Sequence, residues 1–217
     1  MKIRYCVSLL LLCAATIFSK STTANADDRY VKLCERYFTE FAEDYGKFGQ
    51  KDGFTYLYSD KKNTATIVAI PMEQKKVAVP GKINGKTVTK IELMDVFSCS
   101  SNYYFRDEFY GEHEDNPVPK VEYLSIPKTV KVINIYAGIG LTEGYCGELQ
   151  SYLVHLKKFN VASANKWYRS YKGMLYTKNG KKLLLVPRKY MAKTVKVKKG
   201  TTKIADFAFS FCTNIKK

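Results

Sequence analysis

The sequence TVKVKKGTTKIADFAFSFC, residues 194–212, has the pattern of one coil of a repeat protein. β-branched Val195 and Val197 alternate with lysines, which predicts a short strand with one buried face. After a turn at Gly200, apolar residues recur every four positions, at Ile204, Ala208 and Cys212. This spacing predicts one or two helical turns that pack back on the strand. Such a unit cannot bury its apolar face alone, so the pattern predicts stacked neighbours.

Weaker copies of this unit occur upstream. Cys99 follows Ile91 by eight residues, the same spacing that separates Cys212 from Ile204. Strand-like segments open three earlier copies: VAVP at residues 77–80, LSIP at residues 124–127 and LKKFNV at residues 156–161. We therefore expect four stacked coils, each opening on a short strand.

These segments resemble the BspA-type leucine-rich-repeat proteins of bacterial surfaces, whose repeat has the form V-x-I-P-x-x-V-x-x-I-x-x-x-A-F-x-x-C. Residues 54–70 resemble the opening hairpin of that family, residues 79–91 its first coil and residues 165–187 its hairpin insert, in which Asn179-Gly180 is a hairpin signal. The resemblance covers most of the chain after Phe54. It implies a leucine-rich-repeat solenoid over residues 54–217, β-rich and of the α+β class, with short strands on one face and hairpin inserts.

The first 26 residues have the pattern of a secretory signal peptide. Lys2 and Arg4 give a positive start, an apolar run covers residues 7–18, and Ala24-Asn25-Ala26 is a small-residue cleavage site. The alternative, a membrane anchor, is disfavoured because the apolar run is too short to span a bilayer. No second apolar stretch of membrane length follows, so we expect a secreted or cell-surface protein with no transmembrane segment after cleavage.

Residues 27–49 are expected to form an N-terminal helix. Apolar residues recur there at spacings of three and four, and Gly46 and Gly49 mark the expected end. The helix would cap the open end of the solenoid. The other interpretation is a helix that binds a partner, and the oligomeric state stays open.

Four cysteines remain after residue 26: Cys34, Cys99, Cys146 and Cys212. Export permits disulfides, and four cysteines allow three pairings. Cys99 and Cys212 hold the same position in coils one and four, which places them roughly 15 Å apart at ~4.8 Å per stacked strand. A disulfide needs Cα atoms within ~7 Å, so we predict two buried free thiols. The scattered cysteines do not predict a zinc site.

Residues 100–119 interrupt the repeat with aromatic and acidic side chains. Insertions in repeat proteins form loops, often on the binding face. Aromatic rings beside carboxylates could stack on sugars and accept their hydroxyl hydrogen bonds, although the rings could also fold down on the solenoid and leave the acids solvated. The acids lack the order of a calcium loop. The candidate binding residues are Tyr103, Tyr104, Phe105, Asp107, Glu108, Phe109 and Tyr110.

Much of the net charge of +16 lies near the carboxyl end: residues 166–217 hold fifteen lysines or arginines and one acid, Asp206. A field of one sign attracts polyanions, and outside a cell these would be anionic surface polymers. The other interpretation is a solvated face without a specific partner. No motif for nucleic-acid binding accompanies the charge. The predicted basic face comprises Lys181, Lys182, Arg188, Lys189, Lys196, Lys198 and Lys199.

No catalytic motif, cofactor motif or metal motif is present. His113 lies between two glutamates without an identifiable nucleophile, and His155 is expected at the surface. The family resemblance implies a non-catalytic protein that binds or adheres to an extracellular protein or glycan. Two alternatives stay open: a secreted polysaccharide-acting enzyme or accessory module that uses the acidic insertion, and a structural or assembly protein. At residue 217 the chain is either truncated or ends on an exposed coil.

Overall fold

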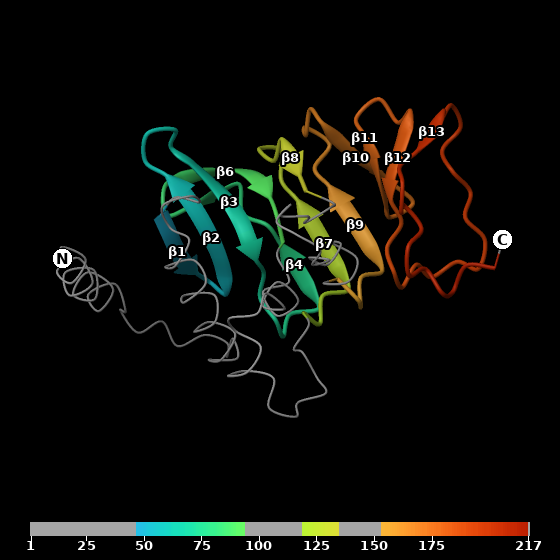
Figure 1. The fold of residues 1–217 in the computed structure, drawn as a ribbon, viewed down its shortest axis with the longest axis horizontal. Coiled ribbons are helices and arrows are strands. Elements are labelled where there is room, and N and C mark those ends of the chain that lie inside the picture. Colours follow the sequence, from blue (N-terminus) through green and yellow to red (C-terminus); the bar gives the residue numbers. More distant parts are fainter. Residues whose placement is uncertain (1–46, 94–118, 135–152, 217) are drawn as a thin grey trace, which may run out of the picture.

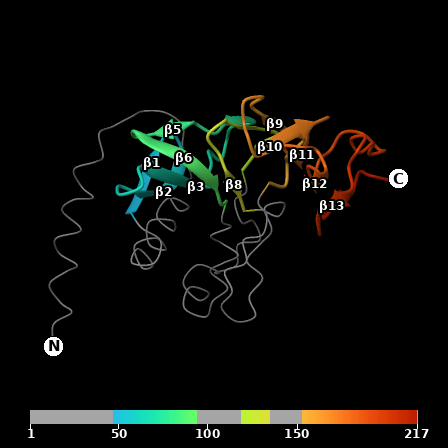
Figure 2. The same ribbon diagram turned by 90° about the horizontal axis from the view of Figure 1, so that it is seen from above.

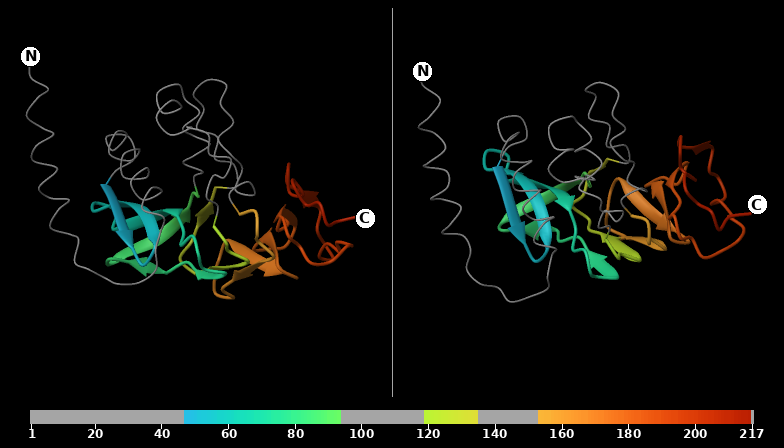
Figure 3. Two further views of the ribbon diagram at one scale, coloured as in Figure 1. Left: turned by 90° about the horizontal axis from the view of Figure 1, so that it is seen from below. Right: turned by 60° about the horizontal axis from the view of Figure 1, so that its bottom comes forward.

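The computed structural model describes residues 47–93, 119–134 and 153–216. Within these segments all regular secondary structure is β-strand and no helix is present. Figure 1 shows the strands following one another along the long axis, with β1 near one end and β13 near the other, and Figures 2 and 3 show the same order from other sides. The strands are β1 (Lys47–Lys51), β2 (Phe54–Ser59), β3 (Thr64–Ala69), β4 (Lys76–Ala78), β5 (Lys82–Ile83), β6 (Lys86–Ile91), β7 (Tyr123–Ile126), β8 (Val132–Ile133), β9 (Lys158–Val161), β10 (Tyr168–Tyr171), β11 (Met174–Thr177), β12 (Lys182–Leu185) and β13 (Lys203–Ile204).

The described residues open on an antiparallel meander of β1, β2 and β3. The hairpin expected over residues 54–70 is confirmed as β2 and β3. The helix expected over residues 27–49 is wrong at its end, because residues 47–49 belong to β1; its other residues lie outside the described part. The two-residue turn Asp52-Gly53 has φ of 51° and 77°, the twist that favours tight strand pairing.

A first parallel ladder joins β4, β7 and β9, the strands expected to open successive coils. Lys76 pairs with Tyr123, and Tyr123 pairs with Lys158. The first pair is 47 positions apart in the sequence and the second is 35 positions apart, yet the register places the partners side by side. One row of this ladder is fully buried: Val77, Leu124 and Phe159. The predicted stacking of these three strands is therefore confirmed.

A second parallel ladder joins β3, β6 and β8. Ile91 pairs with Ile133, so these two isoleucines occupy equivalent positions in the ladder. The amides of Glu92 and Asn134 extend the ladder by donating to the carbonyls of Ile67 and Ile91 at 2.8 Å. The residues of the two ladders share a common core, which contains Ile67, Val77, Val88, Ile91, Leu124, Ile126, Ile133 and Phe159.

The hairpin insert expected over residues 165–187 is confirmed as antiparallel strands β10, β11 and β12. The turn at Asn179-Gly180 joins β11 to β12, with Gly180 at a φ of 71°. β13 then pairs in parallel with β12, so that Lys203 lies beside Lys182, only 21 residues away. A separate core cluster forms here around Met174, Tyr176, Leu183, Val186, Tyr190, Ala205 and Ala208.

Residues 194–212 differ from the expected coil. No strand covers Val195 to Val197, and β13 forms instead at Lys203–Ile204. A turn precedes β13, in which the Thr201 amide donates to the Lys198 carbonyl at 3.0 Å. The helical turns are also wrong: residues 206–211 form successive turns, because Phe207 and Phe211 adopt positive φ of 57° and 58°, outside the right-handed helical region. Of the three expected core positions, Ala208 is buried, Cys212 is half-buried and Ile204 is exposed.

Tyrosine hydroxyl groups connect segments that are distant in the sequence. The Tyr168 hydroxyl accepts a hydrogen bond from the Ile133 amide at 3.0 Å, and the fully buried Tyr176 accepts one from the Lys198 amide at 3.2 Å. Each bond satisfies a backbone donor that no strand pairs. The insert is thereby attached to β8 on one side and to the turn that begins at Lys198 on the other.

Acid should weaken the β2–β3 end of the molecule through Asp60. Its carboxylate accepts from Lys47 Nζ and Lys86 Nζ, both at 2.7 Å, and these bonds lower the pKa of Asp60 from 3.8 to about 2. Because the folded pKa lies below the unfolded one, the stabilisation is present above pH ~4 and is lost as the pH falls through ~2. A carboxyl NMR titration should therefore give a pKa near 2 for Asp60.

The exposure of Asp60 makes this effect sensitive to salt, since solvent ions screen exposed pairs. The variant Asp60→Asn should lose less stability between pH 4 and pH 2 than the parent chain. A titration midpoint near 4 at low salt would contradict the prediction.

Candidate binding surfaces

The first parallel ladder has an outward-facing side that combines lysines, a tyrosine and small polar groups. Side chains alternate along a strand, so the neighbours of the buried row Val77, Leu124 and Phe159 point outward. The register places the outward residues in two rows across the three strands. We call this surface the strand face: Lys76, Tyr123 and Lys158 in the first row, and Ala78, Ser125 and Asn160 in the second.

The first row of the strand face places a lysine on each strand that flanks Tyr123. Lys76 Nζ lies 6.0 Å from the centre of the Tyr123 ring, within cation–π range. The Lys158 stem packs against Gly173, where a Cβ would lie only 2.9 Å from Lys158 Cγ. Gly173 also has a φ of 83°, so two features of the β10–β11 turn favour glycine there. The lysine stems are thus positioned by their neighbours.

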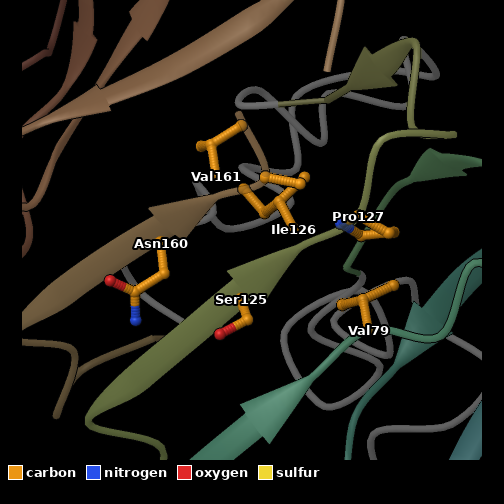
Figure 4. A pocket seen from close by; sticks show the side chains of 7 residues that line it. Val79, Ser125, Ile126, Pro127, Asn160 and Val161 are labelled. Atoms are coloured by element: carbon orange, nitrogen blue, oxygen red, sulfur yellow. The ribbon is translucent and has the colours of Figure 1, made fainter. Parts of the chain in front are cut away.

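The second row borders a shallow depression of about 320 Å³ at the carboxyl ends of β4, β7 and β9. Figure 4 shows the Ser125 and Asn160 side chains on one side of the sheet, and those of Ile126 and Val161 on the other. Val79, Pro127 and Ala162 border the depression just after their strands end. The strand face therefore lies beside a hollow whose border is mostly apolar, and Ser125 and Asn160 of the second row line one part of that hollow.

Ser125 Oγ and the Asn160 amide have no side-chain hydrogen-bond partner among the residues that the structure describes. Each side chain is half-buried. Neutral hydrogen-bonding groups that face solvent beside a hollow are available to a ligand, because water is then the partner that a ligand displaces. The strand face therefore offers a ring, two cations, a hydroxyl and an amide.

An ion pair borders the first row of the strand face. Lys157 Nζ lies 2.9 Å from Glu122 Oε2, and this hydrogen bond lowers the pKa of Glu122, with smaller contributions from Lys75 and His155. The same bond raises the pKa of Lys157. His155 is exposed, as predicted. Glu122 therefore neutralises Lys157, which is not part of the strand face, and does not pair with Lys76 or Lys158.

The structure brings part of the predicted basic face together around the β11–β12 turn. The carbonyl of Lys181 accepts from the Thr202 amide at 2.8 Å, the Lys198 stem packs over Gly180, and Lys198 Nζ donates to the Lys199 carbonyl. Lys182 lies directly beside Lys203 on the neighbouring strand. The basic cluster therefore consists of Lys181, Lys182, Lys198, Lys199 and Lys203.

Three residues of the predicted basic face are not brought into the basic cluster by any contact. Arg188 lies over the Phe211 ring at 5.0 Å, and the amide of Lys189 donates to the Leu156 carbonyl. Lys196 is exposed, and no contact joins it to the cluster.

Lys203 belongs to the basic cluster but was not predicted from the sequence, although the alternation of Thr201 and Lys203 could have suggested a strand. Like charges side by side on paired strands cost stability, so the pair Lys182 and Lys203 favours an anion nearby.

The seven candidate residues of the acidic insertion, from Tyr103 to Tyr110, lie outside the described residues, as does His113. Within the described ranges no three histidine, cysteine, aspartate or glutamate side chains gather as metal ligands would. Helices able to cross a membrane are likewise not found in that part of the chain.

The Cys212 thiol should react slowly in the folded protein. Cys212 is a free cysteine, as predicted, but only half-buried; Cys99 lies outside the described residues. Its Sγ lies 3.5 Å from the Val186 carbonyl oxygen and 3.6 Å from that of Pro187. Burial raises the pKa of Cys212 from 9.0 to about 11, against a smaller opposing effect of Arg188. The thiolate, the reactive form, is then roughly 100-fold scarcer at pH 8.

The measurement is iodoacetamide labelling at pH 8, read peptide by peptide by mass spectrometry. Labelling of Cys212 should be at least ~10-fold slower in the native chain than in the same chain in urea, since thiolate reactivity rises somewhat as pKa rises. Equal labelling rates in the two states would show that the thiol is not shielded.

Comparisons with known proteins yield similarity to solved structures. No family model and no curated protein sequence matches the chain. A leucine-rich repeat protein from Eubacterium ventriosum is similar with 16% identity and a TM-score of 0.36, covering 78% of this chain and 58% of that one. The pneumococcal vaccine antigen PcpA is similar with 12% identity and a TM-score of 0.27, covering 76% of this chain and 62% of that one. This chain thus spans about three-fifths of each protein, and likenesses this distant assign no function.

Proposed function

We propose that this chain is a non-catalytic leucine-rich-repeat protein, secreted or displayed at a cell surface, that binds an extracellular protein or glycan. The strand face carries the proposal: three strands, separated by long stretches of sequence, align a half-buried ring, two exposed cations and two neutral polar groups on one surface. Repeat proteins recognise ligands on extended surfaces of this kind. The signal-peptide pattern supports export, and the two parallel ladders support a solenoid of stacked coils.

The test is binding of the purified full-length chain to immobilised extracellular proteins and glycans, measured at low and high salt. The variant Tyr123→Ala should lose at least ~10-fold in affinity, since exposed aromatic residues dominate binding surfaces. Its matched control is Trp167→Ala, which removes an exposed aromatic ring that lies under Lys131 rather than on the strand face. Both variants should keep the thermal unfolding transition of the parent chain.

A third variant, lacking residues 100–119, separates the strand face from the acidic insertion. Binding that survives this deletion and is lost in Tyr123→Ala would support the proposal. Binding that is lost only on deletion would place recognition in the insertion. Hydrolysis of a polysaccharide by the parent chain would overturn the non-catalytic assignment and favour the enzyme alternative.

A further inference from the structure

The strand face offers three kinds of groups in a fixed arrangement. Tyr123 presents a ring between two lysine stems, and Ser125 lies two residues further along the same strand, on the same side. Asn160 lies beside Ser125 on β9. Strand geometry sets the spacings: about 4.8 Å between neighbouring strands and about 6.6 Å between the two rows. The surface is therefore about the size of one or two sugar rings.

We propose that the strand face binds an acidic saccharide, that is, a sugar that carries a carboxylate; this inference rests on the proposed function. The Tyr123 ring stacks on the C–H face of the sugar, as aromatic residues do in ligand sites. Lys158 and Lys76 pair with the carboxylate from either side of the ring. Ser125 Oγ and the Asn160 amide exchange hydrogen bonds with the sugar hydroxyls, and the amide can both donate and accept.

The charges of the strand face favour an acidic sugar over a neutral one. Lys76 and Lys158 have no ion pair with an acid among the described residues, whereas Lys157 and Lys120 are paired with Glu122 and Glu73. The cations of the strand face are thus available, while neighbouring lysines are neutralised. A neutral sugar would use the ring, hydroxyl and amide and leave both cations unused.

The same surface fits other macromolecules less well. A protein partner usually buries a large side chain in a well-packed pocket, but the hollow beside the strand face is shallow, and its apolar border is interrupted by Ser125 and Asn160. A nucleic acid needs many phosphate contacts, and here two lysines lie beside one ring. A longer row of cations is found in the basic cluster, which serves as the control surface for charge.

The experiment is isothermal titration of the full-length chain with a hyaluronan oligosaccharide and with the same oligosaccharide after reduction of its carboxyl groups. The acidic form should bind at least tenfold more tightly. Lys158→Gln should reduce that preference severalfold, whereas Tyr123→Ala should weaken both forms, because stacking does not depend on charge. Lys203→Gln, in the basic cluster, is the control for attraction to charge in general, and it should reduce the preference for the acidic form less than Lys158→Gln does.

Each outcome decides the inference. Equal binding of the acidic and reduced forms, or an equal loss in Lys158→Gln and Lys203→Gln, would overturn it, the second by showing attraction to charge in general. Binding of an extracellular protein or a neutral glycan through Tyr123, without binding of the acidic form, would overturn the inference and leave the proposed function standing. No binding of any protein or glycan would count against both.

Discussion

Replacement of Asn165 by alanine should lower the free energy of unfolding by about 3–5 kcal/mol, because a buried polar group left unpaired costs about 1–3 kcal/mol. Asn165 is fully buried. Its amide nitrogen donates to the carbonyls of Pro127 and Val130, both at 2.9 Å, and its Oδ1 accepts from the amides of Trp167 and Tyr168, both at 2.8 Å. Alanine would leave four backbone groups without this partner.

The variant Asn165→Asp distinguishes hydrogen bonding from packing. Aspartate nearly preserves the shape and can still accept from the two amides, but its carboxylate would face two carbonyl oxygens and lack the donors that they need. We expect Asn165→Asp to be at least as destabilising as Asn165→Ala at pH 7, measured by urea unfolding. Equal stability of Asn165→Asp and the parent chain would contradict this role.

Asn160→Ala provides the matched control for Asn165→Ala. Asn160 is half-buried on the strand face, and its amide has no protein partner among the described residues. Surface substitutions of this kind usually change stability by less than about 0.5 kcal/mol. If the two alanine variants were equally destabilised, the hydrogen bonds of Asn165 would not be the cause.

Replacement of Phe159 by alanine should cost about 3–5 kcal/mol, because it removes a large buried ring and leaves a cavity. Phe159 is fully buried in the row that also contains Val77 and Leu124. Its amide donates to the Gly173 carbonyl at 2.9 Å, so the residue lies where the first parallel ladder meets the insert. Loss of the ring should therefore loosen the insert as well as the core.

Phe207→Ala is the matched control, because Phe207 is 61% exposed and the chemical change is the same. It should cost well under half as much as Phe159→Ala in urea unfolding. Hydrogen exchange should show faster opening of β10 and β11 in Phe159→Ala alone. Comparable destabilisation by the two variants would mean that the buried row does not anchor the insert.

The strands that depend on local pattern could be predicted from the sequence. The segments at residues 77–80, 124–127 and 156–161 each carry apolar residues at alternating positions, and each overlaps one strand of the first ladder. The Asn179-Gly180 turn was predictable because its backbone geometry favours those residue types. Repetition of one pattern also predicted that these strands would lie side by side.

The last coil could not be predicted because tertiary contacts override its local pattern. Val195 and Val197 alternate as a strand would, but pairing begins at Lys203, where the Lys181 carbonyl accepts from the amides of Thr202 and Lys203. The spacing of Ile204, Ala208 and Cys212 matches a helix. Phe207, between them, nevertheless adopts a positive φ that no sequence rule for phenylalanine predicts.

The strand face was missed because its residues carry no motif. Tyr123, Ser125 and Asn160 are unremarkable in sequence, and they form a surface only when the register aligns β7 with β9. A usable signal existed: in each predicted strand, the residues between the buried positions must point outward on the same side. The aromatic insertion and the lysine-rich end were predicted as binding surfaces because their composition differs from that of the rest of the chain.

The register of the parallel pairs is independent of the length of chain between them. Lys76 and Tyr123 are 47 residues apart, whereas Lys182 and Lys203 are 21 apart, yet both pairs align in the same parallel manner. Closing the longer loop costs only about 0.7 kcal/mol more in chain entropy, by the logarithmic dependence on length. In evolutionary terms, a lineage can lengthen or shorten the surface loops between strands at little cost in chain entropy and inherit the aligned strands unchanged. The parts of these segments that enter the core, such as Val88 and Ile91, stay constrained.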